Sequence, residues 1–359
     1  MKFKNVFIVI LFVLIVSACA QGAKPTPTPV VIRDVNQPEV SFSAGQTPSP
    51  VPFQFSLPTP GAEPVSGWRP PLYPVPWAVS PYDHFYFTRP IAADQANWPI
   101  PDYRYGGIFF APNIVHTGID IPTPEGTPIM AAGAGTVVWA GWGLFTEAPK
   151  NETDPYGLAV AIRHDFGYKD QQLYTIYAHM SEVKALLGQH VETGDLIGLV
   201  GETGATTGPH VHFEVRFPNN AFANTYNPEL WLAPPQGWGV LVGRVMDTKE
   251  KTLQQVEVTL RFIEKKKTYV VKTYGGGGAV NPDPYYNENL VLGDLPAGFY
   301  KMTILYDKKT YQTWVEIFPG QVTYFTFTGE MGFNNTIRPP APTLESLPEV
   351  LPATPTVIP

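Results

Sequence analysis

The segment TGPHVHFEV, from Thr207 to Val215, decides how the middle of the chain folds. Its second half alternates histidine and glutamate with apolar residues, and the side chains of a β-strand alternate between two faces. A strand therefore places His210, His212 and Glu214 on one face and the apolar residues between them on the other. The apolar face can cover a hydrophobic core, so the polar face must line a site of another kind.

The surrounding sequence predicts an all-β protein. Between about Asp83 and Leu232, short apolar stretches such as GLAVAIRHDFG and LYTIYAHM are separated by glycine-rich turns, which is typical of an antiparallel sheet that closes into a barrel or sandwich. From about Trp238 to Gly329, alternating stretches such as VEVTLRF predict a small β-sandwich. The one helix that we expect is short and covers about Ser181 to Leu187.

Proline marks the two ends of the chain, which holds 40 prolines in 359 residues. Stretches rich in proline and threonine cannot form a packed core and favour extended conformations. We therefore expect five parts along the chain: a lipoprotein signal peptide (1–18), a tether (19–81), an antiparallel, barrel-like β domain (82–236), a β-sandwich (237–330) and a proline-rich tail (331–359).

The first 19 residues have the pattern of an export signal. Lys2 and Lys4 precede the apolar run VFIVILFVLIV, which is shorter than the about 20 residues that a membrane-spanning helix needs. The run leads into VSAC, and Cys19 is the only cysteine in the chain. This stretch resembles the lipobox of bacterial lipoproteins, in which the cysteine is acylated; an ordinary signal peptide is the alternative. The resemblance implies an exported chain that faces the cell wall and is anchored to the cell membrane or outer membrane through lipid on Cys19.

Two classes of function are disfavoured by the sequence. The formal net charge of −7 argues against a nucleic-acid partner, which would require a basic surface. The stretch VETGDLIGLVG is similar to the hairpin of lipoyl or biotinyl carrier domains. Such a carrier needs a lysine at the tip of the hairpin, and the residues from Glu192 to Asp195 offer none.

A second polar pair lies upstream, in the stretch VHTGIDIPTPEGTPI. Gly118 and the β-branched residues around it favour a strand, in which His116, Gly118 and Asp120 share one face and the glycine leaves room between the polar groups. A zinc ion takes about four ligands at roughly 2.0–2.2 Å. His116, Asp120 and either His210 or His212 would supply three of them, and the open fourth position is typical of a catalytic zinc site.

The pieces HTGID, YAHM and GETGATTGPHVHFEV together resemble the lysostaphin-type zinc endopeptidases, which cut peptide bridges in bacterial cell walls. The similarity covers roughly Phe87 to Leu232, and the combination is far more specific than any one piece. The resemblance implies a single zinc ion and a peptidoglycan peptide as substrate. It also implies that His116, Asp120 and His212 are the three metal ligands. His179 and His210 would be the two catalytic histidines beside the metal.

In the mechanism that this resemblance implies, His179 or His210 takes a proton from a zinc-activated water, which attacks the scissile carbonyl. The sequence leaves open which histidine is the base and which peptide bond is cleaved. The alternative function is a catalytically silent module of the same fold, which would bind wall peptides or regulate another hydrolase. Such modules usually lack a metal ligand, whereas this chain keeps all of them.

Four residues near these motifs carry further expectations. By strand alternation, Glu214 lies on the metal side as a partner of a ligand, and Tyr177 shares a face with His179. We expect His164 to cap a strand or to bond to the backbone, and we expect His84 to lie at the surface. The stretch LFTEAPKNETDPY, between Gly143 and Gly157, is longer than the turn that the family usually has there, and it would either wall the cleft or change which peptides fit.

Overall fold

The structure is a computed structural model that describes residues 70–78, 83–92, 103–108, 114–275 and 278–335, and the backbone of 349–350. The expected signal peptide, Cys19 and most of the tether and tail lie outside these ranges. The described part contains strands and 3₁₀ turns but no α-helix, which confirms the all-β prediction. Within this part, no helix has the length and apolar character needed to cross a membrane.

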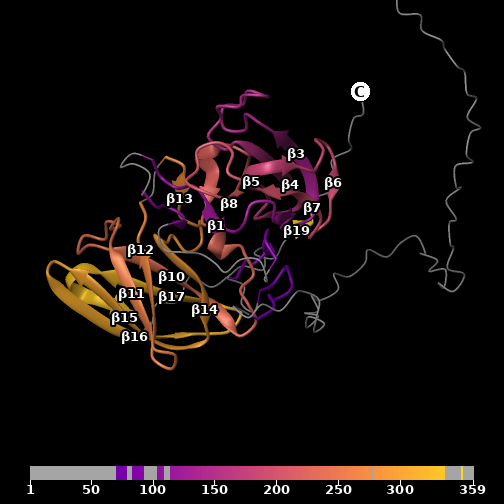
Figure 1. Cartoon of the computed structure of the whole chain (residues 1–359). Coiled ribbons are helices and arrows are strands. Elements are labelled where there is room, and N and C mark those ends of the chain that lie inside the picture. The colour runs from indigo at the N-terminus through magenta and orange to yellow at the C-terminus, as the bar shows by residue number, and fades with distance from the viewer. Residues whose placement is uncertain are drawn as a thin grey trace, which may run out of the picture. The chain divides into compact units, whose positions relative to one another are not determined.

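An 11-stranded sheet carries the histidine-rich segment, and its strands β3, β4, β5 and β8 run side by side (Figure 1). The main path of the sheet has the order β13-β9-β8-β5-β4-β3-β6, while β1 pairs with β8, β7 pairs with β2 and β5, and β19 pairs with β4. Its strands are β1 (Ile119–Pro122), β2 (Pro128–Met130), β3 (Gly135–Gly141), β4 (Leu158–Tyr168), β5 (Gln171–Val183), β6 (His190–Val191), β7 (Leu196–Val200), β8 (His210–Arg216), β9 (Thr225–Tyr226), β13 (Val280–Asn281) and β19 (Glu349–Val350).

Strand β8 lies inside this sheet and pairs in antiparallel fashion with β1, β5 and β9. Its apolar residues Val211, Phe213 and Val215 are fully buried and join the main hydrophobic core, as the alternation predicts. Its polar residues are buried as well, because every residue of the strand is covered. The polar face therefore lies inside the protein, where each polar group needs a partner.

Two four-stranded sheets form the predicted β-sandwich, with the orders β14-β10-β17-β18 and β12-β11-β15-β16 (Figure 1). Val258, Leu260 and Phe262 of β11 face the core between them, as the alternation of VEVTLRF predicts. The strands are β10 (Trp238–Met246), β11 (Glu257–Phe262), β12 (Lys267–Lys272), β14 (Leu290–Pro296), β15 (Gly298–Tyr306), β16 (Lys309–Ile317), β17 (Val322–Thr328) and β18 (Gly332–Asn334). Three 3₁₀ turns complete the described elements: η2 (Phe222–Asn224), η3 (Pro228–Leu230) and η4 (Gly329–Met331).

The part before residue 237, here called the first region, and the part from 237 to 335, the second region, share one hydrophobic core. Val240, Val242, Tyr286 and Val291 of the second region belong to the same core cluster as the apolar face of β8. Strand β13 of the second region also pairs in parallel with β9 of the first sheet. The expected boundary between 236 and 237 stays a prediction, and the core is continuous across it.

Two local predictions are wrong. Ser181 to Leu187 is not helical, because Glu182 and Val183 continue β5 and pair with β7. Tyr177 and His179 do not share a face. Tyr177 is buried in the core, whereas His179 adopts a positive φ of 63° in a stretch where the pairing register of β5 shifts. This backbone irregularity breaks the simple alternation of the strand.

Candidate metal centre

The pairing of β1 with β8 brings three predicted ligands together. Asp120 on β1 lies directly opposite His212 on β8 in the register of these two strands. His116 precedes β1 and is held by a backbone pair outside the strand. The N–H of His116 donates to the carbonyl oxygen of Gly107 at 2.8 Å. The carbonyl oxygen of His116 accepts from the N–H of Gly106, also at 2.8 Å. Strand pairing and this short backbone pair therefore fix all three Cα positions.

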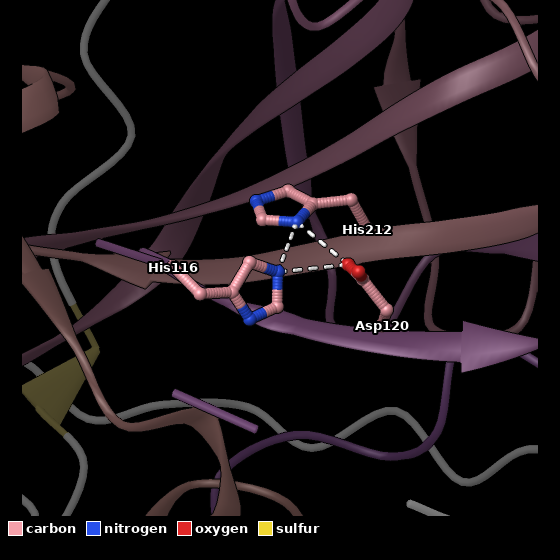
Figure 2. Close-up of side chains that lie close together, drawn as sticks. All are labelled: His116, Asp120 and His212. Carbon is pink, nitrogen blue, oxygen red and sulfur yellow. Dashed lines mark hydrogen bonds and ion pairs between the residues drawn. The ribbon is translucent and has the colours of Figure 1, made fainter. Parts of the chain in front are cut away.

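One polar atom from each side chain points to a common place (Figure 2). His116 Nε2 lies 2.9 Å from Asp120 Oδ1 and 3.0 Å from His212 Nδ1, and His212 Nδ1 lies 2.9 Å from Asp120 Oδ1. A tetrahedral site with bonds of about 2.1 Å separates its ligand atoms by about 3.4 Å. The three residues are only 2–5% exposed. They form a compact, buried set of nitrogen and oxygen donors of the kind that binds a metal ion.

The other nitrogen of each ligand ring decides its tautomer. His116 Nδ1 lies 3.0 Å from the carbonyl oxygen of Arg104, and His212 Nε2 lies 2.9 Å from Glu214 Oε1. A carbonyl and a carboxylate only accept, so both ring N–H groups point there. In the neutral rings, the nitrogens that face Asp120 therefore carry lone pairs. The two nitrogen lone pairs and the carboxylate oxygen of Asp120 all carry negative charge density toward the same point. A cation at this point would be stabilised, so the residues fit a metal ion.

The electrostatics of the three residues agree with this demand for positive charge. Burial opposes ionisation of Asp120, but His116 and His212 hold the pKa of Asp120 well below its usual range. Burial also opposes a charge on His212, yet its hydrogen bonds to Asp120 and Glu214 outweigh this effect and raise its pKa to about 9. The site therefore attracts a proton or a metal cation at neutral pH.

Glycine is required between the two ligands of the HTGID segment. A Cβ added to Gly118 would lie 2.3 Å from the carbonyl oxygen of Phe213 and 2.9 Å from the Nε2 atom of His212. The glycine therefore lets β1 approach β8 closely and leaves space for the ring of His212. We predicted from the sequence that this residue makes room, and the structure identifies a ligand ring as one of the groups that need the room.

Glu214 is the hub of a buried network behind His212. Its carboxylate accepts hydrogen bonds from the hydroxyl of Thr117, from the hydroxyl of Tyr156 at 2.6 Å and from Nε of Arg216 at 2.7 Å. Burial would raise the pKa of Glu214, but Arg216 and His212 lower it to about 2. Glu214 is therefore an anion that orients His212. We expected it beside a ligand, but sequence reasoning missed Thr117, Arg216 and Tyr156.

His179 and His210 lie beside the three ligands. The Nδ1 atom of each is 2.8 Å from a backbone carbonyl oxygen, that of Thr203 for His179 and that of Gly208 for His210. Their ring centroids are 4.7 Å apart, and the Nε2 atom of His210 is 3.5 Å from Asp120 Oδ1. Each Nδ1–H is used by its carbonyl, which leaves each Nε2 as a proton acceptor.

The two rings are neutral at neutral pH. Burial and the neighbouring rings of His212 and His210 lower the pKa of His179 to about 3, and burial lowers the pKa of His210. A neutral imidazole can accept a proton, as general-base chemistry requires. The structure therefore brings together all five residues that the sequence singles out at this site.

The remaining histidines serve other purposes. His164 Nδ1 donates to the carbonyl oxygen of Ala134 at 3.1 Å, which confirms the backbone bond predicted for it, and its Nε2 accepts from Thr175 at 2.8 Å. The prediction that His84 lies at the surface is wrong. His84 is buried against Trp231 and lies 3.3 Å from Asp283 of the second region. Its burial depends on a distant segment that local sequence does not reveal.

Comparison with known proteins finds similarity in the part of the chain that carries the site. Residues 114–225 match the model of Peptidase family M23. The peptidoglycan DD-endopeptidase ShyA of Vibrio cholerae is 38% identical over 101 residues, which are 28% of this chain and 20% of that protein. The uncharacterized lipoprotein YgeR of Escherichia coli is 38% identical over 120 residues, which are 33% of this chain and 40% of that protein.

A solved structure is also similar. It is the catalytic domain of a mutant of the prophage-encoded M23 protein EnpA from Enterococcus faecalis, with 30% identity and a TM-score of 0.31. The match covers 40% of this chain and 95% of that chain. The chain spans 40% or less of the length of the first curated relatives that it matches.

Proposed function

We propose that the chain is a zinc-dependent endopeptidase that hydrolyses peptide cross-bridges or stem peptides of bacterial peptidoglycan. The observation that carries the proposal is the convergence of His116 Nε2, Asp120 Oδ1 and His212 Nδ1 within 3.0 Å of one another. The match of residues 114–225 to M23 peptidases supports the reaction class. The similarity to a protein named as a peptidoglycan endopeptidase supports the class of substrate.

The three converging atoms would hold the ion, and their chemistry favours zinc. Imidazole nitrogen and carboxylate oxygen are common zinc donors, and a set of three protein ligands is typical of catalytic zinc. A bound zinc ion supplies Lewis acidity, which activates water and polarises a carbonyl group. Asp120 and Glu214 supply the negative charge that offsets the ion. Glu214 also keeps the His212 ring in the tautomer that presents its Nδ1 lone pair.

His179 and His210 supply the proton transfers. Each ring is held by a carbonyl at Nδ1, so its free Nε2 can take the proton of the attacking water. The protonated ring can then return that proton to the amine that leaves as the peptide bond breaks. To stabilise the charge that develops on the carbonyl oxygen, the other histidine would have to carry a proton on its Nε2 atom as well. The complete donor set argues against a catalytically silent module of the same fold.

We also propose where the enzyme acts and how the chain is divided. The lipobox-like stretch before Cys19 and the lipoprotein named among the relatives support an exported chain with a lipid anchor at this cysteine. In this arrangement the tether of residues 19–81 separates the anchor from the catalytic region of residues 82–236. The β-sandwich of residues 237–330 follows the catalytic region.

The test is digestion of purified muropeptides by the full chain, with products identified by mass spectrometry. We expect cleavage that stops when a chelator removes the metal and returns when zinc is added. The His190→Ala variant is a matched control, because this histidine is exposed and lies outside the site. Cleavage that continued in metal-free protein, or an absence of cleavage with zinc bound, would contradict the proposal.

A further inference from the structure

The loop of residues 103–108, which we call the support loop, holds His116 in two ways. The carbonyl oxygen of Arg104 accepts the hydrogen bond from the Nδ1–H of His116 at 3.0 Å. Gly106 and Gly107 form the backbone pair with His116 described above. The position of the support loop therefore sets the backbone of His116 and the orientation of its ring.

The second region packs directly against the support loop. Gly106 has a positive φ of 75°, and a Cβ added to it would lie 2.2 Å from the Cβ of Tyr274. The buried ring of Tyr105 meets the ring of Tyr274 edge-on, with centroids 5.3 Å apart. Val280 completes this apolar cluster. Tyr274 and Val280 thus form a surface on which the backbone and the Tyr105 ring of the loop rest.

Hydrogen bonds fix Tyr105 from both regions. Its hydroxyl donates to the carbonyl oxygen of Thr225 at 2.6 Å and accepts from the backbone N–H of Asn281 at 2.9 Å. Thr225 lies on β9 of the first region, and Asn281 lies on β13 of the second region. A buried tyrosine hydroxyl requires such partners. The ring therefore has a defined place only where β13 is paired with β9.

An ion pair fixes the residue whose carbonyl oxygen contacts His116. The guanidinium of Arg104 pairs with Glu229, and both side chains are buried. The same carboxylate oxygen of Glu229 accepts the backbone N–H of Gly293 on β14 at 2.6 Å. The second region thus also contributes a hydrogen bond to the acid that holds Arg104.

The support loop borders a pocket of about 320 Å³, which residues of both regions line, including the exposed Ile108, Gln255 and Lys272. Among the described residues, the contacts with Tyr274, Val280 and Asn281 connect the loop to the second region.

We propose that the second region positions His116 for metal binding by holding the support loop through Tyr274, Val280 and strand β13. The proposal rests on the proposed function in one respect, which is that His116 is a metal ligand. It gives the second region a positioning role in the same molecule. A change at this border should weaken metal binding although it touches no ligand side chain.

Two matched pairs of variants test the proposal in the full chain. Val280→Ala removes two methyl groups beside Tyr105, and Val258→Ala removes the same groups from the core of the sandwich. Tyr105→Phe removes the hydroxyl that bridges the two regions. Its control, Tyr300→Phe, removes a buried hydroxyl that donates to Pro296 within the second region. The pairs match in chemistry and in burial, and they differ in contact with the support loop.

The measurement is the dissociation constant for Zn²⁺, obtained by competition with a chromophoric chelator. Thermal unfolding and the visible absorption of the Co²⁺-loaded protein are recorded alongside it. We expect Val280→Ala and Tyr105→Phe to raise the constant about 10-fold, at the lower end of losses caused by changing the partner of a ligand. Their Co²⁺ spectra should change. Both controls should stay within about twofold of the unmodified chain, because they leave the ligand's partners in place.

The outcomes separate this proposal from the proposed function. An unmodified chain that binds no Zn²⁺ would refute the metal site itself. If the unmodified chain binds Zn²⁺ while Val280→Ala and Tyr105→Phe bind it as tightly as their controls, only the positioning role is refuted. The same holds if affinity falls in all four variants in proportion to their loss of thermal stability, because that result would indicate a general effect on folding.

Discussion

The first and second regions differ in what they bury. On β8 of the first region, His212 and Glu214 lie inside the protein and contact other polar side chains, including Asp120. The core between the two sheets of the second region consists of aliphatic and aromatic residues. A fold of this kind buries a row of polar groups only where hydrogen bonds or an ion satisfy them. The difference supports the proposal that the chemistry takes place in the first region.

Two buried carboxylates of the second region lie where it meets the first region. Asp283 lies 3.3 Å from His84, and Asp294 pairs with Arg89, so each of these two carboxylates has a partner from the other region. Loss of one partner from a buried ion pair typically costs about 3–5 kcal/mol. Glu288 is also buried, and it accepts a hydrogen bond from Tyr274 within the second region. The comparison therefore indicates that Asp283 and Asp294 fix a border, whereas the polar residues of β8 belong to the proposed site.

The largest effect is expected from a ligand of the first region. His212→Ala should lose the metal and reduce cleavage of muropeptides by about 1,000-fold or more, because water activation depends on the ion. His190→Ala is the matched change at an exposed histidine and should retain activity. Steady-state cleavage rates and metal content measure both variants. A His212→Ala protein that still binds zinc and cleaves muropeptides would contradict the assignment of the metal site to the first region.

The next effect separates proton transfer from metal binding. His179→Ala and His210→Ala should each keep the metal and lower cleavage by about 100- to 10,000-fold, as expected for removal of a general acid or base. Both side chains bond to backbone carbonyls and lie outside the three converging ligands. Loss of zinc from either variant would show that the residue is a ligand, and the assignment of roles would be wrong.

A smaller effect concerns the network behind the ligands. Glu214→Gln should weaken zinc binding by about 10- to 100-fold, because the neutral amide no longer holds the His212 ring as an anionic acceptor does. Glu257→Gln, at an exposed position of the sandwich, should leave zinc affinity unchanged. Competition with a chelator measures both constants. Equal affinities for the two variants would place Glu214 outside the metal network.

The smallest effect is the response of stability to acid, and it also belongs to the first region, because all seven histidines precede residue 237. Burial lowers the pKa of His164 from 6.5 to about 4, so the unfolded chain takes up its proton first as the pH falls. Stability contributed by neutral His164 is complete above pH 6.5 and is lost as the pH approaches 4. The loss at pH 5 is about 2 kcal/mol.

Denaturant unfolding from pH 7.5 to 5 measures this dependence on metal-free protein. The His164→Asn variant has no titrating ring at this position and should show a shallower loss of stability towards pH 5 than the unmodified chain. Identical pH slopes for the two proteins would mean that His164 is not held neutral by its surroundings.

The sequence predicts much of the site because strand alternation survives there. His210, His212 and Glu214 share a face as the period of two requires, and the apolar residues between them lie in the core. The motif containing His116 and Asp120 is equally local. The tautomer of the His212 ring follows from Glu214 on the same strand, whereas that of the His116 ring follows from the carbonyl oxygen of Arg104 on a separate loop. Arg104 and Tyr156 carry no signal in the sequence alone.

The predictions that are wrong also fail because of contacts between segments that are distant in the sequence. Tyr177 and His179 would share a face in a regular strand, but the positive φ of His179 turns its side chain to the site. The expected helix near Ser181 is a strand because β7 offers a hydrogen-bonding partner. His84 is buried because aromatic residues and Asp283 gather around it. In each case, contacts between distant segments override the local preference.

The most direct test of the account is the zinc content of purified, active protein, determined by elemental analysis after dialysis against metal-free buffer. We predict about one zinc ion per chain, since one set of three ligands can bind one ion. Asp120→Ala should bring this content close to zero together with activity. Active protein that contains no zinc, or an Asp120→Ala variant that retains a full zinc ion, would contradict the claim that His116, Asp120 and His212 form a catalytic metal site.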